Sequence, residues 1–287
     1  MKKLLIIILA ITMLTGCAIQ TSLETEKTTV TFQETSATAK QSDSETTPEQ
    51  TVYRGWYEVK MTCLNPDRSV EFISVYEYEA GKRAKQTTTN SDGIINYYEN
   101  YKYDNNGNKL LEEQYSKNGE LSKKTEYKYN ESNRAIEKMV YKENGELKMK
   151  TLYEYDEDGN ISREKYYSAS LDEWEELSYT YDEDGNVLTY KKDGEINRFE
   201  YKFDDKGNVV EEKFFTNNNN QFSIIYYKYD ENNNIIKETT KYFVELTDNI
   251  SVYEYDAFGN MTMETQYNTD GDIKRIYTHE YEMIKSQ

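Results

Sequence analysis

The chain has 287 residues, with 53 acidic against 35 basic side chains and a formal charge of −18 at pH 7. A polyanion with scattered basic residues has no surface that neutralises phosphates, so nucleic acid is excluded from the expected partners. Two cysteines cannot build a disulfide framework, and 29 tyrosines contradict a chain that is disordered throughout.

The first 16 residues predict a signal peptide. Residues 2–3 are basic, and residues 4–13 form an apolar stretch that is too short to span a bilayer. The segment ends in LTGC, with Cys17 last, which resembles the lipobox of bacterial lipoproteins. The resemblance implies that Cys17 carries acyl chains and anchors the mature protein, outside the cytoplasm, to the bacterial cell membrane. The alternative is an ordinary secretory signal in which this cysteine is incidental.

Residues 17–52 are predicted to be the lipidated cysteine and a flexible, acidic tether. Thr, Ser, Glu and Gln dominate this segment, and Phe32 is its single aromatic residue. Such a composition cannot bury enough apolar surface to offset the entropy of ordering. A flexible coil of about 35 residues has an r.m.s. reach of roughly 30–35 Å, which separates the folded part from the lipid headgroups.

Residues 53–287 are predicted to form one domain that is built from a repeated unit, and all 29 tyrosines lie in it. Each unit opens with aromatic-x-aromatic-acid and continues into a turn rich in Asp, Asn and Gly, as in YKYDNNGN and YEYDEDGN. Most units have 26 residues, but the unit from Tyr179 to Tyr201 has 22. The loss of an even number of residues shortens a hairpin without changing which side chains share a face.

Each unit is expected to form two antiparallel strands. The Tyr-x-Tyr pair is expected at the centre of the first strand, with both rings on one face because the side-chain period of a strand is two. The following turn carries Gly107 or Gly159 in two units and Asn234 at the matching place of another, and both residue types tolerate a positive φ. The second strand follows, as at residues 209–215 and 261–267, and an Asn-Gly or Asp-Gly turn closes the unit.

The unit resembles the YD repeat of the Rhs family, whose copies run Tyr-x-Tyr-Asp-x-x-Gly-Asn/Arg, and the resemblance begins at about Tyr76. In that family the repeats coil as β-hairpins into a large shell around a toxin. This chain is too short for a closed shell and shows no toxin segment, so the resemblance implies hairpin geometry alone. The expected fold class is all-β: a repetitive antiparallel hairpin meander of about 16–18 strands, which forms a long, twisted, open sheet about 80 Å in length.

The tyrosine rows supply the candidate binding surface, together with one tryptophan that stands outside the repeat phase. The residues are Tyr101, Tyr103, Tyr153, Tyr155, Tyr179, Tyr181 and Trp174. Rings spaced along a sheet can stack on sugar faces or on aromatic groups of another protein. The alternative is that these rings form the core of a thin sheet and bind nothing.

No catalytic centre, cofactor or metal site is expected. The single histidine, His279, stands where a unit places its first Tyr, so histidine-dependent nucleophilic catalysis has no other candidate. The acidic turns at residues 156–160 and 182–186 offer oxygens to calcium, but they lack the spacing of an EF-hand loop, and turn formation explains them. Cys63 is expected to be a small buried side chain, with a reactive thiol or an intermolecular disulfide as the alternative.

The predicted function is that of a lipid-anchored bacterial surface protein whose non-catalytic repeat domain binds a ligand or serves as a scaffold. A glycan or a surface protein is the expected ligand, and the lipid anchor contacts the membrane. Two other hypotheses stay open: a carbohydrate-active enzyme that uses paired carboxylates, and a structural or immunity partner of another repeat protein.

Overall fold

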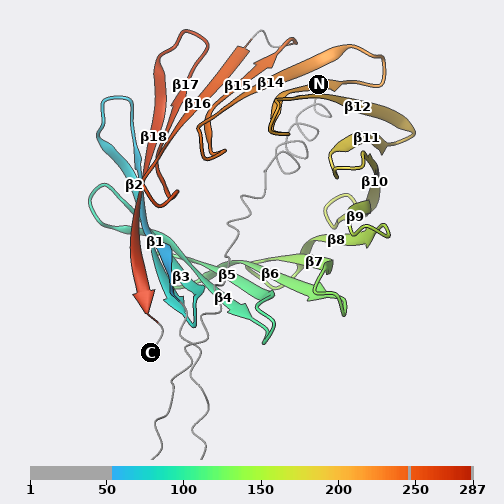
Figure 1. Ribbon diagram of the computed structural model, residues 1–287. Helices are drawn as coiled ribbons and strands as arrows, with labels where there is room; N and C mark the ends of the chain where they lie inside the picture. The colour runs from blue at the N-terminus through green and yellow to red at the C-terminus, as the bar shows by residue number, and fades with distance from the viewer. Residues whose placement is uncertain (1–53, 245–246, 286–287) are drawn as a thin grey trace, which may run out of the picture. The chain divides into compact units, whose positions relative to one another are not determined.

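The computed structural model describes residues 54–244 and 247–285, all within the compact unit Gln50–Gln287 (Figure 1). The predicted signal peptide, Cys17 and the tether lie outside the described residues. The described part contains no helix of the length and apolarity that a membrane crossing requires. Its strands are β1 (Arg54–Leu64), β2 (Val70–Glu79), β3 (Lys82–Asn90), β4 (Ile95–Tyr103), β5 (Lys109–Ser116), β6 (Leu121–Tyr129), β7 (Ala135–Lys142), β8 (Leu147–Tyr155), β9 (Ile161–Ser168), β10 (Glu173–Tyr181), β11 (Val187–Lys192), β12 (Glu195–Phe203), β13 (Val209–Phe215), β14 (Gln221–Tyr229), β15 (Ile235–Tyr242), β16 (Thr247–Tyr255), β17 (Met261–Tyr267) and β18 (Ile273–Lys285).

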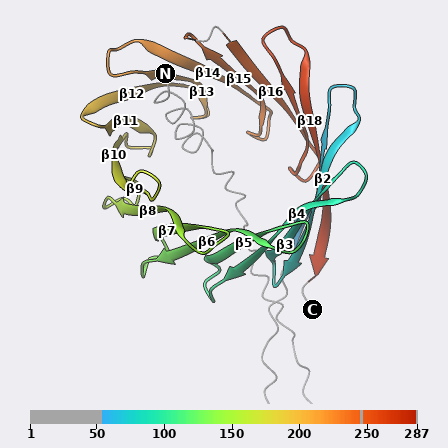
Figure 2. The same ribbon diagram turned by 180° about the vertical axis from the view of Figure 1, so that it is seen from behind.

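The strands form one antiparallel sheet that closes on itself. Each strand pairs with its neighbours in the chain, and β1 also pairs with β18. Figures 1 and 2 show the resulting 18-stranded barrel from opposite sides. The predicted all-β antiparallel meander is confirmed. The predicted open sheet is wrong, because its two edge strands meet along a seam from Arg54–Lys285 to Leu64–Ile276.

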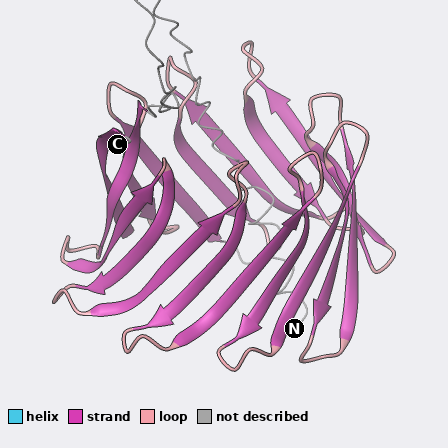
Figure 3. Ribbon diagram, turned by 90° about the horizontal axis from the view of Figure 1, so that it is seen from below, coloured by secondary structure: helices cyan, strands magenta, loops and turns pink. Residues whose placement is uncertain are grey.

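A stagger of two residues in most hairpins tilts the strands, as Figure 3 shows from below. Tyr101 lies opposite Glu112 in β5, and Glu112 lies opposite Thr125 in β6, which is two residues before Tyr127. Each hairpin is thus shifted by about 7 Å along the strand direction relative to the previous one, while two strands span about 10 Å across the sheet. This ratio corresponds to a strand tilt of about 35° relative to the barrel axis. Equivalent residues of successive units therefore lie about 12 Å apart on a circle around the barrel axis.

The 22-residue unit shortens one hairpin, and its side chains still alternate between the inner and the outer face in the same order, as predicted. Its strand β11 has only six residues. Tyr179 lies opposite Tyr190, and Tyr190 lies opposite Asn197, four residues before Tyr201. This hairpin is therefore staggered by four residues instead of two. The bulges that interrupt the register of most hairpins add twist, and together with the stagger they bring β18 against β1, where pairing satisfies both free edges.

The Tyr-x-Tyr pairs lie at the ends of the even-numbered strands, and not at their centres as predicted: β4 ends at Tyr103 and β8 at Tyr155. The second strands predicted at residues 209–215 and 261–267 are confirmed as β13 and β17. All even-numbered strands run in the same direction, so every Tyr-x-Tyr pair lies near the same end of the barrel. We call this end the tyrosine rim, and it is formed by the turns that follow the even-numbered strands.

The turns of the tyrosine rim are fixed by their first residue. The Asp104 carboxylate accepts hydrogen bonds from the backbone N–H groups of Asn106 and Asn108, at 2.9 and 2.8 Å. Gly107 has a φ of 89°, as predicted for this position. In the unit from Tyr227, the positive φ belongs to Asn233 (65°) and not to Asn234, because Asn233 occupies the glycine position of the turn.

The face of the sheet that carries Tyr-x-Tyr is the inner face of the barrel. Side chains converge on the concave side of a curved sheet and diverge on the convex side, so the more buried face is the concave one. The residues on the tyrosine face that are less than a tenth exposed include Ser74, Tyr76, Thr88, Thr125, Val140, Thr151, Glu164, Leu177, Tyr179, Tyr190, Phe199, Glu212 and Phe214. The opposite face carries ion-pair ladders such as Lys128–Glu137–Lys150, with N–O distances of 2.6 and 2.7 Å.

Candidate binding surface

Two belts of aromatic side chains line the inner face near the tyrosine rim. The first-position belt consists of Tyr76, Tyr101, Tyr127, Tyr153, Tyr179, Tyr201, Tyr227, Tyr253 and His279. The second-position belt consists of Tyr78, Tyr103, Tyr129, Tyr155, Tyr181, Phe203, Tyr229, Tyr255 and Tyr281. Both follow from the stagger of the hairpins, which places equivalent residues on one circle.

The hydroxyl groups of the second-position belt hold neighbouring strands together. Tyr103 donates to the carbonyl oxygen of Arg83 at 2.9 Å, and Tyr129 donates to that of Lys109 at 2.8 Å. The same bond, to a carbonyl at the start of the preceding odd-numbered strand, joins Tyr155 to Ala135, Tyr181 to Ile161, Tyr229 to Val209 and Tyr255 to Ile235. These hydroxyl groups fix the rings against the wall of the barrel.

The shortened unit makes the same bond with a different residue. Phe203 occupies its second position and has no hydroxyl group. The extra stagger of two residues brings the first-position Tyr201 into reach instead, and its hydroxyl donates to the carbonyl oxygen of Val187 at 2.9 Å. The bond is therefore kept where the residue that usually makes it is absent.

A third set of inward side chains alternates with the first-position belt and comes from the odd-numbered strands. We call it the carboxylate belt; it consists of Gln86, Glu112, Lys138, Glu164, Tyr190, Glu212, Glu238 and Glu264. The sequence analysis missed this belt. Its signal was present, because in five units a Glu follows the last Asn of the turn by four residues, as Glu112 follows Asn108.

Basic side chains accompany the belts in β3–β8. The Arg83 guanidinium lies 3.7 Å from the centre of the Tyr76 ring. The Lys109 Nζ lies 2.9 Å from a Glu112 carboxylate oxygen and 5.3 Å from the ring centres of both Tyr101 and Tyr127. Burial raises the pKa of Glu112, but the hydrogen bond and charge of Lys109 and the charge of a second lysine outweigh it, and the net shift is downward.

Glu164 connects two tyrosines in the middle of the inner wall. Its carboxylate accepts a hydrogen bond from the Tyr179 hydroxyl at 2.7 Å and another from the Tyr166 hydroxyl. Burial raises the pKa of Tyr179, and the negative charge of Glu164 raises it further. Both hydroxyl groups therefore stay protonated and act as donors.

The three carboxylates of β13, β15 and β17 form no ion pair with any described residue. Glu212 is 9% exposed, and burial followed by the charge of Glu238 raises its pKa to about 7. Burial also raises the pKa of Glu238, whose carboxylate accepts a hydrogen bond from the Thr240 hydroxyl at 3.3 Å. Glu264 accepts one from the Gln266 amide at 2.7 Å. This side of the belt thus carries carboxyl groups without an ion-pair partner among the described residues, and burial makes the charged forms of Glu212 and Glu238 costly.

The predicted binding residues do not form one surface. The six tyrosines lie together in the two belts, on β4, β8 and β10. Trp174 lies on the outer face of β10, near the opposite rim, where it is 52% exposed and its ring centre is 5.2 Å from that of Tyr167. It follows that a ligand of the tyrosine belts does not contact Trp174.

The other residues that the sequence analysis considered for metal binding or catalysis contribute to turns, to the buried interior or to contacts between strands. The Asp156 carboxylate accepts hydrogen bonds from the backbone of Gly159 and Asn160 at 2.7 and 2.8 Å, so it forms the turn. No group of potential metal ligands occurs among the described residues. Cys63 is fully buried, and burial followed by a hydrogen bond to Glu71 raises its pKa to about 11. His279 contributes Nδ1 to a 2.6 Å hydrogen bond with a carboxylate oxygen of β1.

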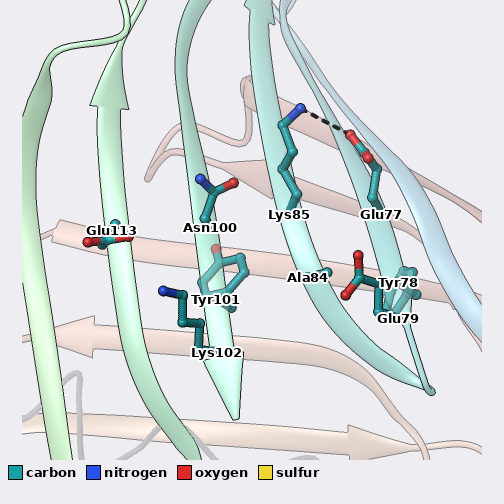
Figure 4. A pocket seen from close by; sticks show the side chains of 9 residues that line it. All are labelled: Glu77, Tyr78, Glu79, Ala84, Lys85, Asn100, Tyr101, Lys102 and Glu113. Atoms are coloured by element: carbon teal, nitrogen blue, oxygen red, sulfur yellow. Dashed lines mark ion pairs between the residues drawn. The ribbon is translucent and has the colours of Figure 1, made fainter.

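A depression of about 530 Å³ lies over β2–β5 (Figure 4). Its lining includes Glu77, Lys85, Asn100, Lys102 and Glu113, which alternate with the inward tyrosines along their strands. Glu77 and Lys85 form an ion pair across it at 3.4 Å. The depression is polar and open, and it lacks the apolar walls that enclose a small ligand.

No family model matches the chain, and neither does any curated protein. Among solved structures, the chain is similar to the complex TcdB2-TccC3-Cdc42, with 13% identity and a TM-score of 0.38 over 75% of this chain. It spans only 15% of that protein. It is also similar to porin-like proteins from Bacteroides uniformis (8% identity, TM-score 0.37, 78% of this chain and 98% of that one) and Bacteroides vulgatus (14%, 0.38, 79% and 99%).

Proposed function

We propose that this protein is a lipid-anchored bacterial surface protein whose barrel binds a ligand on its inner face without catalysing a reaction. The lipobox-like sequence at Cys17 and the tether of residues 17–52 support the anchoring. The binding surface is the pair of tyrosine belts, and the ligand is a glycan or a surface protein that presents groups to aromatic rings.

The observation that carries the proposal is the fixation of the second-position rings. Hydroxyl-to-carbonyl bonds such as Tyr129 to Lys109 and Tyr181 to Ile161 hold them against the barrel wall before any ligand arrives. A surface that is already ordered loses little side-chain entropy on binding, so more of its contact energy appears as affinity.

The carbohydrate-active alternative requires a general acid with a raised pKa and a second carboxylate roughly 5–10 Å away. Burial raises the pKa of the carboxyl groups of both Glu212 and Glu238. Their backbone positions are two strands and two residues apart, about 12 Å. A catalytic pair needs one protonated and one ionised carboxyl group, whereas burial raises the pKa of both of these, which supports the non-catalytic proposal.

An array of bacterial glycans and surface proteins, probed with the full-length chain in detergent micelles, tests the proposal. We expect at least one ligand to bind, and we expect Tyr153→Ala to weaken binding while Tyr226→Ala, on the outer face, does not. Circular dichroism confirms that both variants are folded. The absence of any ligand at high micromolar concentration contradicts the proposal, and so does turnover of a glycan that a single Glu→Gln substitution abolishes. Co-purification from native membranes identifies a partner protein, if the immunity-partner hypothesis is correct.

A further inference from the structure

We propose that the inner wall of β13–β17 binds organic polycations of the linear polyamine class, through Glu212, Glu238 and Glu264 and the tyrosine rings between them. The inference rests on the proposed function, because it takes the inner face as the binding surface, and it adds a further ligand class to the glycan or surface protein proposed above.

The charge of this wall is the first argument. The lysines of β13–β17 lie one residue out of phase with the carboxylate belt and face outward: Lys213, Lys228, Lys237 and Lys241. The inner face of these five strands therefore carries three carboxylates and no lysine or arginine. A cationic ligand neutralises these charges, whereas an anionic one is repelled.

The second argument is the state of Glu212. Its side chain is 9% exposed and faces the barrel interior opposite Tyr201 and Ile225. Among the described residues, its carboxylate has neither a hydrogen-bond donor nor an ion-pair partner. A buried carboxylate without a partner is costly to keep charged, so a cation that reaches it gains most of the energy of the missing pair.

The third argument is an internal precedent on the other side of the barrel. The Lys109 ammonium binds Glu112 between the rings of Tyr101 and Tyr127, so a niche of tyrosine, carboxylate and tyrosine holds an ammonium group there. Residues that correspond to Lys109 in β13, β15 and β17 are Val209, Ile235 and Met261, which carry no charge. The niches at Glu212 and Glu238 therefore have the walls of an ammonium site and lack the built-in ammonium.

The spacing selects an elongated organic cation over a metal ion. Successive carboxylates of this wall are about 12 Å apart at the backbone, and the described residues contain no group of three or more potential ligands that one metal ion could share. Tyrosine rings stand between the carboxylates, as Tyr253 does between Glu238 and Glu264, and they attract ammonium and methylene groups but not hydrated divalent ions. A flexible chain with several ammonium groups can follow this arc.

Isothermal titration of the full-length chain with spermidine at low ionic strength and pH 8 tests the inference. We expect Glu212→Gln to weaken binding by at least about tenfold. The matched control is Glu211→Gln, which removes the same charge from the adjacent residue of β13 on the outer face, where it pairs with Lys202 and Lys213. Equal affinities of the two variants, or no binding by the wild type at millimolar spermidine, would overturn the inference.

A second variant tests the site without removing a carboxylate. Val209→Lys places an ammonium where Lys109 stands in β5, and we expect it to fill the niche and to weaken spermidine binding by a similar factor. Circular dichroism then shows a folded protein, so loss of binding cannot be attributed to unfolding. Unchanged affinity in this variant would contradict the niche as the site.

Proton release distinguishes direct binding of the cation at Glu212 from a purely structural role of this residue. Glu212 is partly protonated near pH 7, so binding of a cation expels protons, and the measured heat then depends on the ionisation enthalpy of the buffer. We expect this dependence in the wild type and not in Glu212→Gln. A chain that binds a glycan or a surface protein but not spermidine keeps the proposed function and overturns this inference, and a chain that binds none of these overturns both.

Discussion

Removal of the belt hydroxyl groups should destabilise the barrel in equal steps. The change is Tyr→Phe at Tyr103, Tyr129, Tyr155 and Tyr255, whose hydroxyls donate to backbone carbonyls at 2.6–2.9 Å. Each substitution keeps the ring and removes one hydrogen bond, at a cost of about 0.5–1.5 kcal/mol. For a domain of this size, 1 kcal/mol corresponds to roughly 2–4 °C in Tm.

The spacing of the belt predicts additivity. Equivalent tyrosines on adjacent units are about 12 Å apart, beyond the distance at which substitutions usually interact. The fourfold variant should therefore lose about 2–6 kcal/mol, a large part of the stability of a typical domain. Thermal and urea unfolding, followed by circular dichroism, measure both the single and the combined effects.

The chain provides its own controls. Tyr226 is on the outer face, 39% exposed, and its hydroxyl has no hydrogen-bond partner among the described residues, so Tyr226→Phe should change Tm very little. Tyr201→Phe should behave like the belt variants, because Tyr201 makes the bond in the unit that carries Phe203. If the belt variants unfold at the same temperature as Tyr226→Phe, the proposed role of the hydroxyl groups is wrong.

Four further outcomes are expected. Burial raises the folded-state pKa of Glu212 to about 7, so its protonated form favours folding. The free energy of unfolding should therefore fall by up to about 3 kcal/mol as pH rises from 4.5 through 7. Urea unfolding of Glu212→Gln should lack this part of the pH dependence. Cys63 should resist a thiol reagent in the folded protein and react on unfolding, since its side chain is fully buried and its pKa is about 11; rapid reaction of the native state refutes this. Gly145 has a φ of 81° and no atom near the site of a Cβ, so Gly145→Ala should cost roughly 1–2 kcal/mol of backbone strain alone, measurable by thermal unfolding. Cys17→Ala should move the full-length protein from the membrane to the soluble fraction, and a variant that stays with the membrane contradicts lipidation.

The strands were predictable because their information is local. The period of two and the Asp-x-x-Gly turn identify β13 and β17 to the residue, and they put both members of each Tyr-x-Tyr pair on one face. Closure was not predictable, because it depends on the stagger between strands. Each stagger is set by bulges at residues such as Tyr103 and Phe203, and a bulge leaves no distinct mark in the residue types.

The grouping of the candidate binding residues was predictable in part. Periodicity grouped Tyr153 with Tyr179, and the structure places both in one belt. It did not assign Trp174 to the outer face, since that residue stands outside the repeat. The carboxylate belt carried a regular signal, but Glu212 differs from the adjacent Glu211 only in the side it faces. Acidic residues are abundant in the repeats, so the four-residue spacing was needed to separate the inward ones from the rest.

The seam between β1 and β18 changes the structural effect of gaining or losing one repeat unit. An open array has two terminal units that must be shielded from water, and it can gain or lose a unit with little effect on the others. A closed circuit has no terminal unit, and one hairpin that detaches exposes edges on both of its neighbours. Gain of a hairpin would add about 12 Å to the circumference, so the number of repeats sets the bore of the barrel. Duplication or loss of a unit, which only lengthens or shortens an open array, would here alter the width available to whatever enters.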